Sequence, residues 1–506
     1  MNTYNTPIYN YLREYAEQDM NIFHMPGHKL SKGIPQELAR DILRLDVTEV
    51  EGTDNLHYPE GIIKEAEELA AAAFGADRTF FLVNGSTCGI QAAIMSACSR
   101  GQKIIVGRDS HKSVAAGLIL SGAEPVFAYP EYNCEFGIAG AITSKSIEKL
   151  LQEHPDAAAV LVTRPNYYGI CSDIEKIACA VHAHNKLLIV DEAHGAHFAF
   201  NRRLPSPALQ YGADICIQSA HKTLPAVTQG AYLHIKGSRA DAERLKFNLS
   251  MLQTSSPSYI IMSYLDIARE LMVTEGASKL EALISEIELF SRELREYPEY
   301  RILSNSMSES NFKGETTCGS AFLQNLNEKA AHDPTRLVIN IRKLGISGYY
   351  AEKLLRERFK TQVEMADYEN LVFITTIADS PDTFSSLLAA LKGLRGLAFR
   401  GELQGLNLQQ SIIEKYYEEL QTSAFEKAKA GSLPYEAYMA QKKAIPLKES
   451  CGRICADVIT PYPPGIPVLY PGEIIEKYHI RYISAVIEGS GKVNGISYNR
   501  YIQVIK

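Results

Sequence analysis

Residues 187–197 read LLIVDEAHGAH, and this stretch gives the most direct indication of the fold. Four apolar residues form a run with the length of a buried strand, and two acids and two histidines follow within seven residues. An acid at the end of a buried strand costs free energy unless it meets a partner. The stretch therefore predicts a strand of an α/β sheet that carries Asp191 at its carboxyl end, where such sheets bind ligands.

Short apolar runs alternate with helical periodicity on both sides of this strand. The predicted strands span residues 79–83, 103–106, 125–129, 157–162, 187–190 and 215–218. The predicted helices span residues 61–75, 88–99, 113–121 and 175–184. Short strands that are almost wholly apolar and alternate with helices indicate a mainly parallel sheet that is covered on both faces.

The rest of the chain has a different character. Residues up to about Pro59 are polar and rich in turns, and they look like an arm. Residues 260–297 have long helical periodicity and lead into a second α/β segment at 300–385. A charged, helix-rich stretch runs to Lys443, and a β-rich end follows. We therefore expect four parts, with boundaries at 1–60, 61–265, 266–385 and 386–506.

The composition is that of an ordinary globular protein. The chain has 506 residues, which is too long for one core, and 46% of them are hydrophobic and 22% charged. The net charge is −7 without a basic run, which excludes an electrostatic footprint for nucleic acid. We find no secretion signal and no apolar stretch long enough to span a bilayer. The 9 scattered cysteines favour reduced thiols in the cytoplasm, because Cys451 and Cys455 lack the second ligand pair of a zinc site.

A second strand-end motif carries a lysine. Residues 219–223 read SAHKT and follow the predicted strand 215–218. An arbitrary lysine is usually solvated, but Lys222 follows one strand and Asp191 ends the strand before it, so the two form a matched pair. A pyridine-based cofactor needs both, an amine to hold it and a carboxylate for its ring nitrogen. A metal site is the weaker interpretation, because the acids and histidines match no standard zinc ligand set.

Two further motifs lie at strand ends. Residues 84–87 read NGST, and their hydroxyl and N–H groups at a helix start can bind an anion, although Ser and Thr are also ordinary N-caps. Residues 109–113 read DSHKS. A histidine at such a turn is more often a cap, but on the same rim the imidazole of His111 can lie flat on a planar ring.

The order of these motifs resembles that of the pyridoxal-phosphate decarboxylases of ornithine, lysine and arginine. The resemblance covers nearly the whole chain and includes MPGHK at 25–29, GTDNLH at 52–57, TSSPSY at 254–259 and PYPPGIP at 461–467. The last two motifs are specific to this group rather than to aminotransferases. The chain is most similar to the shorter bacterial form, which resembles arginine decarboxylase and lacks a separate N-terminal wing domain.

The resemblance implies a fold-type I architecture, similar to aspartate aminotransferase. Its large domain would hold a mainly parallel seven-stranded sheet and the cofactor, over residues 61–265. A smaller α/β domain and an α+β C-terminal decarboxylase domain would follow it.

The resemblance also implies roles for individual residues. Lys222 would carry pyridoxal 5'-phosphate as a Schiff base, Asp191 would pair with the ring nitrogen, and His111 would stack on the ring. His221 would approach the phosphate or the reaction centre, which makes it the fourth catalytic residue. The cofactor-binding set would be Gly85, Ser86, Thr87, His111, Asp191, Ala193, His194, Ser219, His221, Lys222, Thr254 and Ser255. The candidates for binding substrate are His28, Asp54 and Glu473. The two acids are chosen because the cationic end of the substrate needs a carboxylate.

The implied reaction is decarboxylation of a basic amino acid. The first choice of substrate is L-arginine, which would give agmatine and CO₂, and lysine and ornithine are the alternatives. Agmatine would feed polyamine biosynthesis, and the enzyme would be a homodimer or higher oligomer with shared sites. Another fold-type I enzyme, such as an aminotransferase or a carbon–carbon lyase, is a rival that the motif at 461–467 argues against. An inactive regulatory relative is a second rival, against which the intact Lys222 and Asp191 argue.

Overall fold

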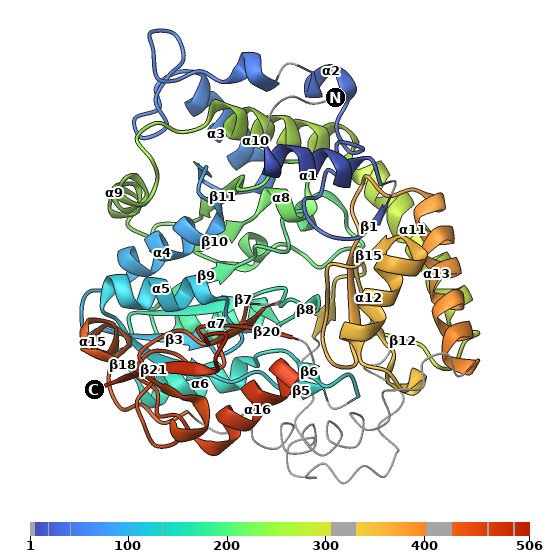
Figure 1. The fold of residues 1–506 in the computed structure, drawn as a ribbon. Coiled ribbons are helices and arrows are strands. Elements are labelled where there is room, and N and C mark those ends of the chain that lie inside the picture. The colour runs from blue at the N-terminus through green and yellow to red at the C-terminus, as the bar shows by residue number, and fades with distance from the viewer. Residues whose placement is uncertain are drawn as a thin grey trace.

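The computed structural model describes residues 6–18, 20–40, 42–133, 135–304, 330–400, 428–462, 465–488 and 491–506. A central sheet lies beside a smaller sheet with its own helices, and the C-terminal segment packs below the central sheet in the view of Figure 1. No helix in the described ranges is long and apolar enough to cross a membrane.

The central sheet has seven strands, as expected. Their order is β2 (Arg78–Leu82), β11 (Ala231–Ile235), β10 (Ile215–Gln218), β9 (Leu187–Asp191), β7 (Ala159–Thr163), β3 (Lys103–Gly107) and β4 (Glu124–Ala128). Only β11 runs antiparallel to its neighbours, so the carboxyl ends of β10, β9, β7, β3 and β4 meet at one edge of the sheet. The prediction of a mainly parallel sheet is confirmed.

Strand β9 shows why these strands are apolar on both sides. Ile189 packs into the core on one face of the sheet, and Leu188 and Val190 pack into the core on the other. Helices α4 (Gly85–Ala97), α5 (Lys112–Ser121) and α9 (Ala242–Leu252) cover the first face. Helices α6 (Ser144–Glu153) and α7 (Ile174–Ala183) cover the second. The predicted helices are confirmed, including α3 (Ile62–Phe74), while α6, α9 and β11 had not been predicted.

The second sheet is small and antiparallel. Its order is β12 (Arg301–Ile302), β14 (Arg336–Asn340), β17 (Asn370–Ile374) and β16 (Met365–Ala366). Helices α11 (Ala277–Leu294), α12 (Gly348–Phe359) and α13 (Pro381–Phe399) surround it. The long periodicity predicted for 260–297 corresponds to α10 (Tyr259–Leu271), a π turn at Met272–Gly276 and α11.

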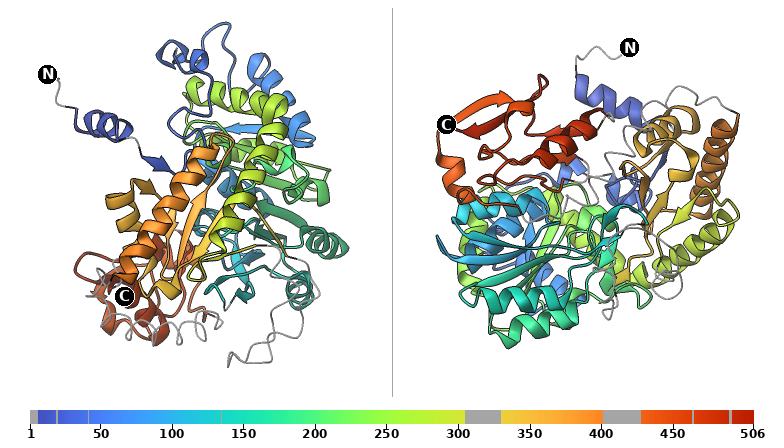
Figure 2. Two further views of the ribbon diagram at one scale, coloured as in Figure 1. Left: turned by 90° about the vertical axis from the view of Figure 1, so that its right-hand side faces the viewer. Right: turned by 90° about the horizontal axis from the view of Figure 1, so that it is seen from below.

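The N-terminal arm docks on this second sheet. Helix α1 (Pro7–Ala16) leads to β1 (Asn21–Ile22), as the left view of Figure 2 shows, and β1 pairs in parallel with β15 (Thr361–Gln362). Phe23 is fully buried and meets the ring of Phe373 edge-on, with ring centroids 5.2 Å apart. The arm is therefore anchored by an apolar side chain.

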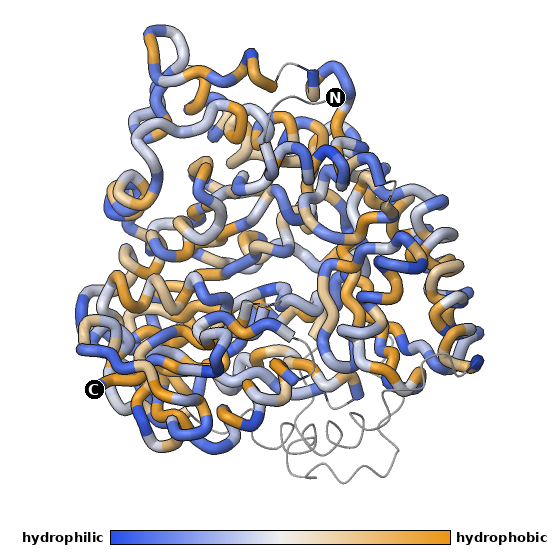
Figure 3. The backbone as a smooth tube through the Cα atoms, in the orientation of Figure 1, coloured by the Kyte–Doolittle hydropathy of each residue, from blue (hydrophilic) through white to orange (hydrophobic). Residues whose placement is uncertain are grey.

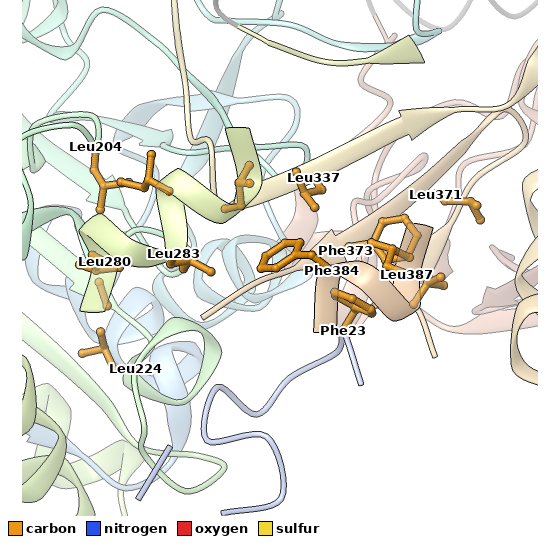
Figure 4. Close-up of a cluster of buried hydrophobic side chains, with 14 of the residues drawn as sticks. Phe23, Leu204, Leu224, Leu280, Leu283, Leu337, Leu371, Phe373, Phe384 and Leu387 are labelled. Atoms are coloured by element: carbon orange, nitrogen blue, oxygen red, sulfur yellow. The ribbon is translucent and has the colours of Figure 1, made fainter. Parts of the chain in front are cut away.

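A single apolar cluster joins the arm, the second sheet and the segment that carries Lys222. Figure 4 shows Leu224, Phe23, Leu337 and Phe373 as parts of this cluster. Figure 3 shows hydrophobic and hydrophilic stretches alternating along the helices and strands throughout the molecule. Because Leu224 is buried in the cluster, the position of Lys222 depends on packing from three parts of the chain.

The C-terminal segment combines short strands with helices α15 (Pro434–Met439) and α16 (Lys477–Glu488). Strand β18 (Lys442–Pro446) pairs with β21 (Tyr501–Ile505), and β19 (Thr460–Tyr462) pairs with β20 (Lys492–Asn494). Residues 401–427 of the charged stretch predicted before Lys443, and the two prolines at 463 and 464, lie outside the described residues.

Candidate active site

Lys222 lies in a short helix, α8 (Ala220–Thr223), directly after strand β10. Its side chain is half-buried, and burial lowers the pKa of the ammonium group to about 8, against the opposing effect of the Asp191 carboxylate. An amine with a lowered pKa is uncharged more often at neutral pH, which is the form that acts as a nucleophile.

Asp191 is the last residue of β9 and is almost fully buried. The parallel pairing of β9 and β10 sets Asp191 opposite Ile217, which brings the acid and the segment of Lys222 to the same edge. Burial raises the pKa of Asp191, while Lys222 and the Ala193 N–H lower it. Within the described part of the chain, the one hydrogen bond to its carboxylate group comes from Ala193 N, at 3.1 Å. A buried carboxylate with a single donor has room for a protonated ring nitrogen as a further partner.

His194 connects Lys222 to a residue that the sequence analysis missed. Its Nε2 lies 3.1 Å from Lys222 Nζ, and its Nδ1 accepts a hydrogen bond of 2.8 Å from Arg336 Nη2. His194 is buried, and both burial and the cations Lys222 and Arg336 lower its pKa well below the usual value. The imidazole is therefore neutral.

The predicted phosphate site is formed where β2 passes into α4. Ser219 Oγ donates to Ser86 Oγ at 2.8 Å, so two of the predicted hydroxyl groups meet. Gly85 has a φ of +71°, the left-handed region that favours glycine, and this lets the chain turn sharply into the helix. Thr87 is exposed in the first turn of α4. Hydroxyl groups at the N-terminus of a long helix suit a phosphate dianion.

His111 caps helix α5, because its Nδ1 accepts from Ser113 N at 3.2 Å. Burial and the cations Lys222 and Lys112 lower its pKa to about 3, so it too is neutral. The C-terminal segment covers its imidazole: a Cβ atom on Gly465 would lie 3.2 Å from His111 Cδ2. The cap that the sequence suggested is present, and stacking of His111 on a cofactor ring stays a prediction.

His221 faces the arm. Its Nδ1 lies 2.9 Å from Gly230 O, and its carbonyl oxygen accepts from Gly27 N at 2.8 Å. A Cβ atom on Gly27 would lie 2.5 Å from Leu224 O, so this glycine permits close approach of the arm to the segment of Lys222. The MPGHK motif thus supports the lysine from the outside.

The candidates for substrate binding lie in other surroundings. His28 Nδ1 accepts from Ser31 N within the arm. The Asp54 carboxylate accepts from four backbone N–H groups, those of Asn55, Glu60, Gly61 and Ile63. Glu473 is buried against Arg108, with Oε2 3.2 Å from Nη2. In the described residues no hydrogen bond links any of the three to Lys222.

Thr254 and Ser255 are exposed, and the loop that holds them contacts the GTDNLH motif. The Nε2 atom of His57 lies 2.9 Å from Thr254 O, and Tyr259 OH donates to Asp54 O at 2.6 Å. Ser258 caps α10 by accepting from Ile261 N. Within one described chain, Thr254 and Ser255 make no hydrogen bond to the cluster around Lys222.

Three residues near the cluster gave no signal in the sequence: Arg336, Tyr167 and Glu364. The Tyr167 ring lies edge-on to His194, with centroids 4.8 Å apart, and its hydroxyl donates to Glu364. Glu364 also accepts from Met25 N at 3.0 Å. Its charge raises the pKa of Lys222 and so reaches the site.

The residues fit pyridoxal phosphate. Lys222 would hold it covalently, Asp191 would meet its ring nitrogen, and Ser86 and Ser219 would bind its phosphate. When bound, the cofactor supplies a protonated ring that accepts the electrons left by CO₂. In the described residues no group of three or more His, Cys, Asp or Glu side chains is arranged to hold a metal ion. The fold and the site together define the class of pyridoxal-phosphate enzymes of fold type I.

Comparisons with known proteins narrow this class. Residues 6–383 match the family model described as Orn/Lys/Arg decarboxylase, major domain, and residues 410–500 match the C-terminal domain of the same family. An arginine decarboxylase of Bacillus subtilis is 37% identical over 503 residues, which cover 98% of this chain and 96% of that protein. An arginine decarboxylase of Bacillus anthracis is 35% identical, with the same coverage.

Solved structures agree on the fold. Lysine decarboxylase A of Pseudomonas aeruginosa has a TM-score of 0.79 at 22% identity, covering 99% of this chain and 80% of that chain. The chain belongs to the Orn/Lys/Arg decarboxylase family. It is a decarboxylase, and pyridoxal phosphate is its cofactor.

Proposed function

We propose that this chain decarboxylates L-arginine to agmatine and CO₂, with lysine as the second choice of substrate. The observation that supports arginine is the likeness to the arginine decarboxylases of Bacillus, at 35% to 37% identity over 98% of the chain. Agmatine would then serve polyamine synthesis in the cytoplasm.

Each cluster residue has a proposed role. Lys222 anchors the cofactor and, with His111, is a candidate for returning a proton to the α-carbon. Asp191 keeps the ring nitrogen protonated, because a buried carboxylate is most stable beside a cation. Ser86, Ser219 and the start of α4 hold the phosphate. His221 orders the Lys222 segment through the arm.

The distal cation of the substrate needs a carboxylate, and the structure adds a candidate to those from the sequence. The oxygens of Asp54 already accept four N–H groups, and Glu473 is paired with Arg108. Glu364 is only half-buried, and its charge acts on Lys222. Among the described residues it accepts hydrogen bonds from two groups, the hydroxyl of Tyr167 and the N–H of Met25. We therefore propose Glu364 as the acid that receives the guanidinium group.

A direct assay tests both proposals. CO₂ release from arginine, lysine and ornithine, measured in parallel, should give the highest kcat/KM for arginine. Glu364→Gln should raise KM for arginine by about tenfold or more, the loss expected for one charge-assisted hydrogen bond. Robust activity on lysine with none on arginine would overturn the substrate assignment. An unchanged KM in the variant would remove Glu364 from the site.

The proposal includes the assembly. We propose that two chains share their active sites, so that a dimer is the smallest active unit. The support is that Thr254 and Ser255 are exposed, as are the apolar side chains Ile8, Tyr11 and Leu12 of α1. We also propose that the chain divides into four domains, with boundaries after residues 60, 265 and 385. In the proposed dimer, the loop with Thr254 and Ser255 and helix α1 would lie at the interface between the two chains.

A further inference from the structure

Arg336 is held rigidly at the start of β14, next to His194. Its side chain is 1% exposed, and the neighbouring Leu337 packs into the apolar cluster that contains Leu224. Gly169 has a φ of +83°, and a Cβ atom there would lie 2.8 Å from Arg336 Cβ, so the stem of the arginine is closely packed. The stem of Arg336 therefore has little freedom to move away from its position beside His194.

The chemistry of this contact fixes the proton on His194. A guanidinium group can only donate hydrogen bonds, so the Nδ1 atom that it contacts at 2.8 Å must accept. A neutral imidazole carries one proton, which must then lie on Nε2. That Nε2–H group lies 3.1 Å from Lys222 Nζ.

Lys222 must adapt to this donor. An ammonium group has no lone pair, so only the uncharged amine accepts a hydrogen bond from His194. The opposite arrangement, with the ammonium donating to Nε2, would put a proton on Nδ1 against the N–H of Arg336. Two donors facing each other in a buried site would each lose a hydrogen bond.

We propose that Arg336 is a positioning residue that fixes His194 with its proton on Nε2 and thereby holds Lys222 as an uncharged amine. The inference rests on the proposed role of Lys222 as the cofactor lysine, and it concerns a step before any substrate binds. The inference therefore does not depend on which substrate the enzyme uses.

The charges around the pair are consistent with this role. Lys222 is faced by Asp191 and Glu364, which favour its charged form, and by Arg336, which opposes it. His194 is faced by Arg336 and Lys222, and by His111 and His221. Burial brings the pKa of Lys222 to about 8. The N–H of His194 stabilises the uncharged amine and so lowers the pKa further.

The test measures the pKa of Lys222 in the full-length chain after removal of the cofactor. The protein is labelled briefly with acetic anhydride over a range of pH, and mass spectrometry follows Lys222 against the exposed Lys64 as an internal reference. Arg336→Met removes the N–H donor to His194 Nδ1 and keeps a side chain of similar volume. Arg336→Lys keeps a charged group that can only donate hydrogen bonds. Arg336→Met should raise the pKa by at least one unit and slow labelling of Lys222 near pH 7 about tenfold. Arg336→Lys should stay within about twofold of the wild type.

A double-mutant cycle separates the hydrogen bonds from the simple charge of Arg336. In a His194→Phe background, loss of Arg336 should shift the pKa of Lys222 much less than it does when His194 is present. An equal shift in both backgrounds, or an unchanged pH profile in Arg336→Met, would overturn the inference. Because the readout is labelling of the cofactor-free chain, it does not depend on which amino acid is decarboxylated.

Discussion

Asp191 and Lys222 show how two ordinary residue types become reactive through their positions at neighbouring strand ends. The parallel register places Asp191 opposite Ile217, and the chain needs only a few more residues to reach Lys222. Burial then moves the pKa of the two groups toward each other, upward for the acid and downward for the amine.

Asp191→Asn tests the role of this carboxylate. The amide oxygen of Asn can still accept from Ala193 N, so the local fold should persist. We expect kcat to fall by several orders of magnitude with the cofactor still bound, because a neutral amide does not hold a proton on the ring nitrogen. Steady-state kinetics and the visible absorbance of bound cofactor measure the two effects. A variant with the wild-type rate would contradict the assignment.

Much of the site follows from the sequence, because Lys222, Asp191 and Ser86 all lie at ends of apolar strands that can be recognised locally. Arg336 could not be found in this way. It contacts His194 across 142 positions of sequence, and nothing in one chain segment tells which residue of a second sheet will face the first. Glu364 and Tyr167 were missed for the same reason.

At the scale of elements, the fold prediction also missed what depends on contacts between distant segments of the chain. The six parallel or edge strands with continuous apolar runs were located within about two residues. Strand β11 was not, because Ala231–Ile235 includes His234, which is buried and bound to Thr79 and Gln218. A buried polar residue interrupts an apolar run, and only its hydrogen-bond partners make the position tolerable.

The contact between the arm and the Lys222 segment leads to a prediction at Gly27. In Gly27→Ala the new methyl group would approach Leu224 O to 2.5 Å, and backbone on both sides must shift. A displacement of this size beside Lys222, the proposed cofactor lysine, should lower kcat by about tenfold to 100-fold. Gly396→Ala in α13 is the matched control, because its new methyl meets only the end of the Arg400 side chain. Equal activity of both variants would show that the arm does not support the site.

Glu67 in α3 leads to a prediction about stability and pH. Its buried carboxylate accepts from Phe81 N of β2, at 2.9 Å, and burial raises its pKa from 4.5 to about 8. Between these values the folded chain keeps a proton that the unfolded chain releases, so Glu67 lowers stability progressively as the pH rises. Glu67→Gln keeps the acceptor and has no charge.

Above pH 8, Glu67→Gln should therefore raise the free energy of unfolding by roughly a few kcal/mol, and Tm should rise with it. Below about pH 4.5 the substitution should change Tm little. Thermal denaturation followed by circular dichroism across this range measures the difference. Glu65→Gln, at an exposed position of the same helix, should show no such trend. A Tm difference that is independent of pH would argue against the shifted pKa.

At the scale of the whole molecule, the proposed dimer can be tested by complementation. Subunits with Lys222→Ala are mixed with subunits that carry Thr254→Ala and Ser255→Ala, and the mixture is unfolded and refolded together. If the loop of one chain completes the site of the other, some mixed dimers hold one intact site and regain up to about half of the wild-type activity per dimer. Each variant refolded alone is the control.

The outcome separates two arrangements. If Thr254 and Ser255 serve only their own chain, where Ser258 caps α10, the mixture gains nothing beyond the sum of its parts. Sedimentation at the assay concentration gives the oligomeric state. A fully active monomer would rule out shared sites.

The contact of Gly465 with His111 has a consequence for the order in which the molecule is made. Synthesis proceeds from the amino end, so His111 and the rest of the strand-end cluster leave the ribosome while the C-terminal segment is still missing. The imidazole face that Gly465 covers in the finished protein is then open to water. A chain that stops before Gly465 leaves this face of His111 uncovered, so a segment translated hundreds of residues after the cluster is needed to cover it.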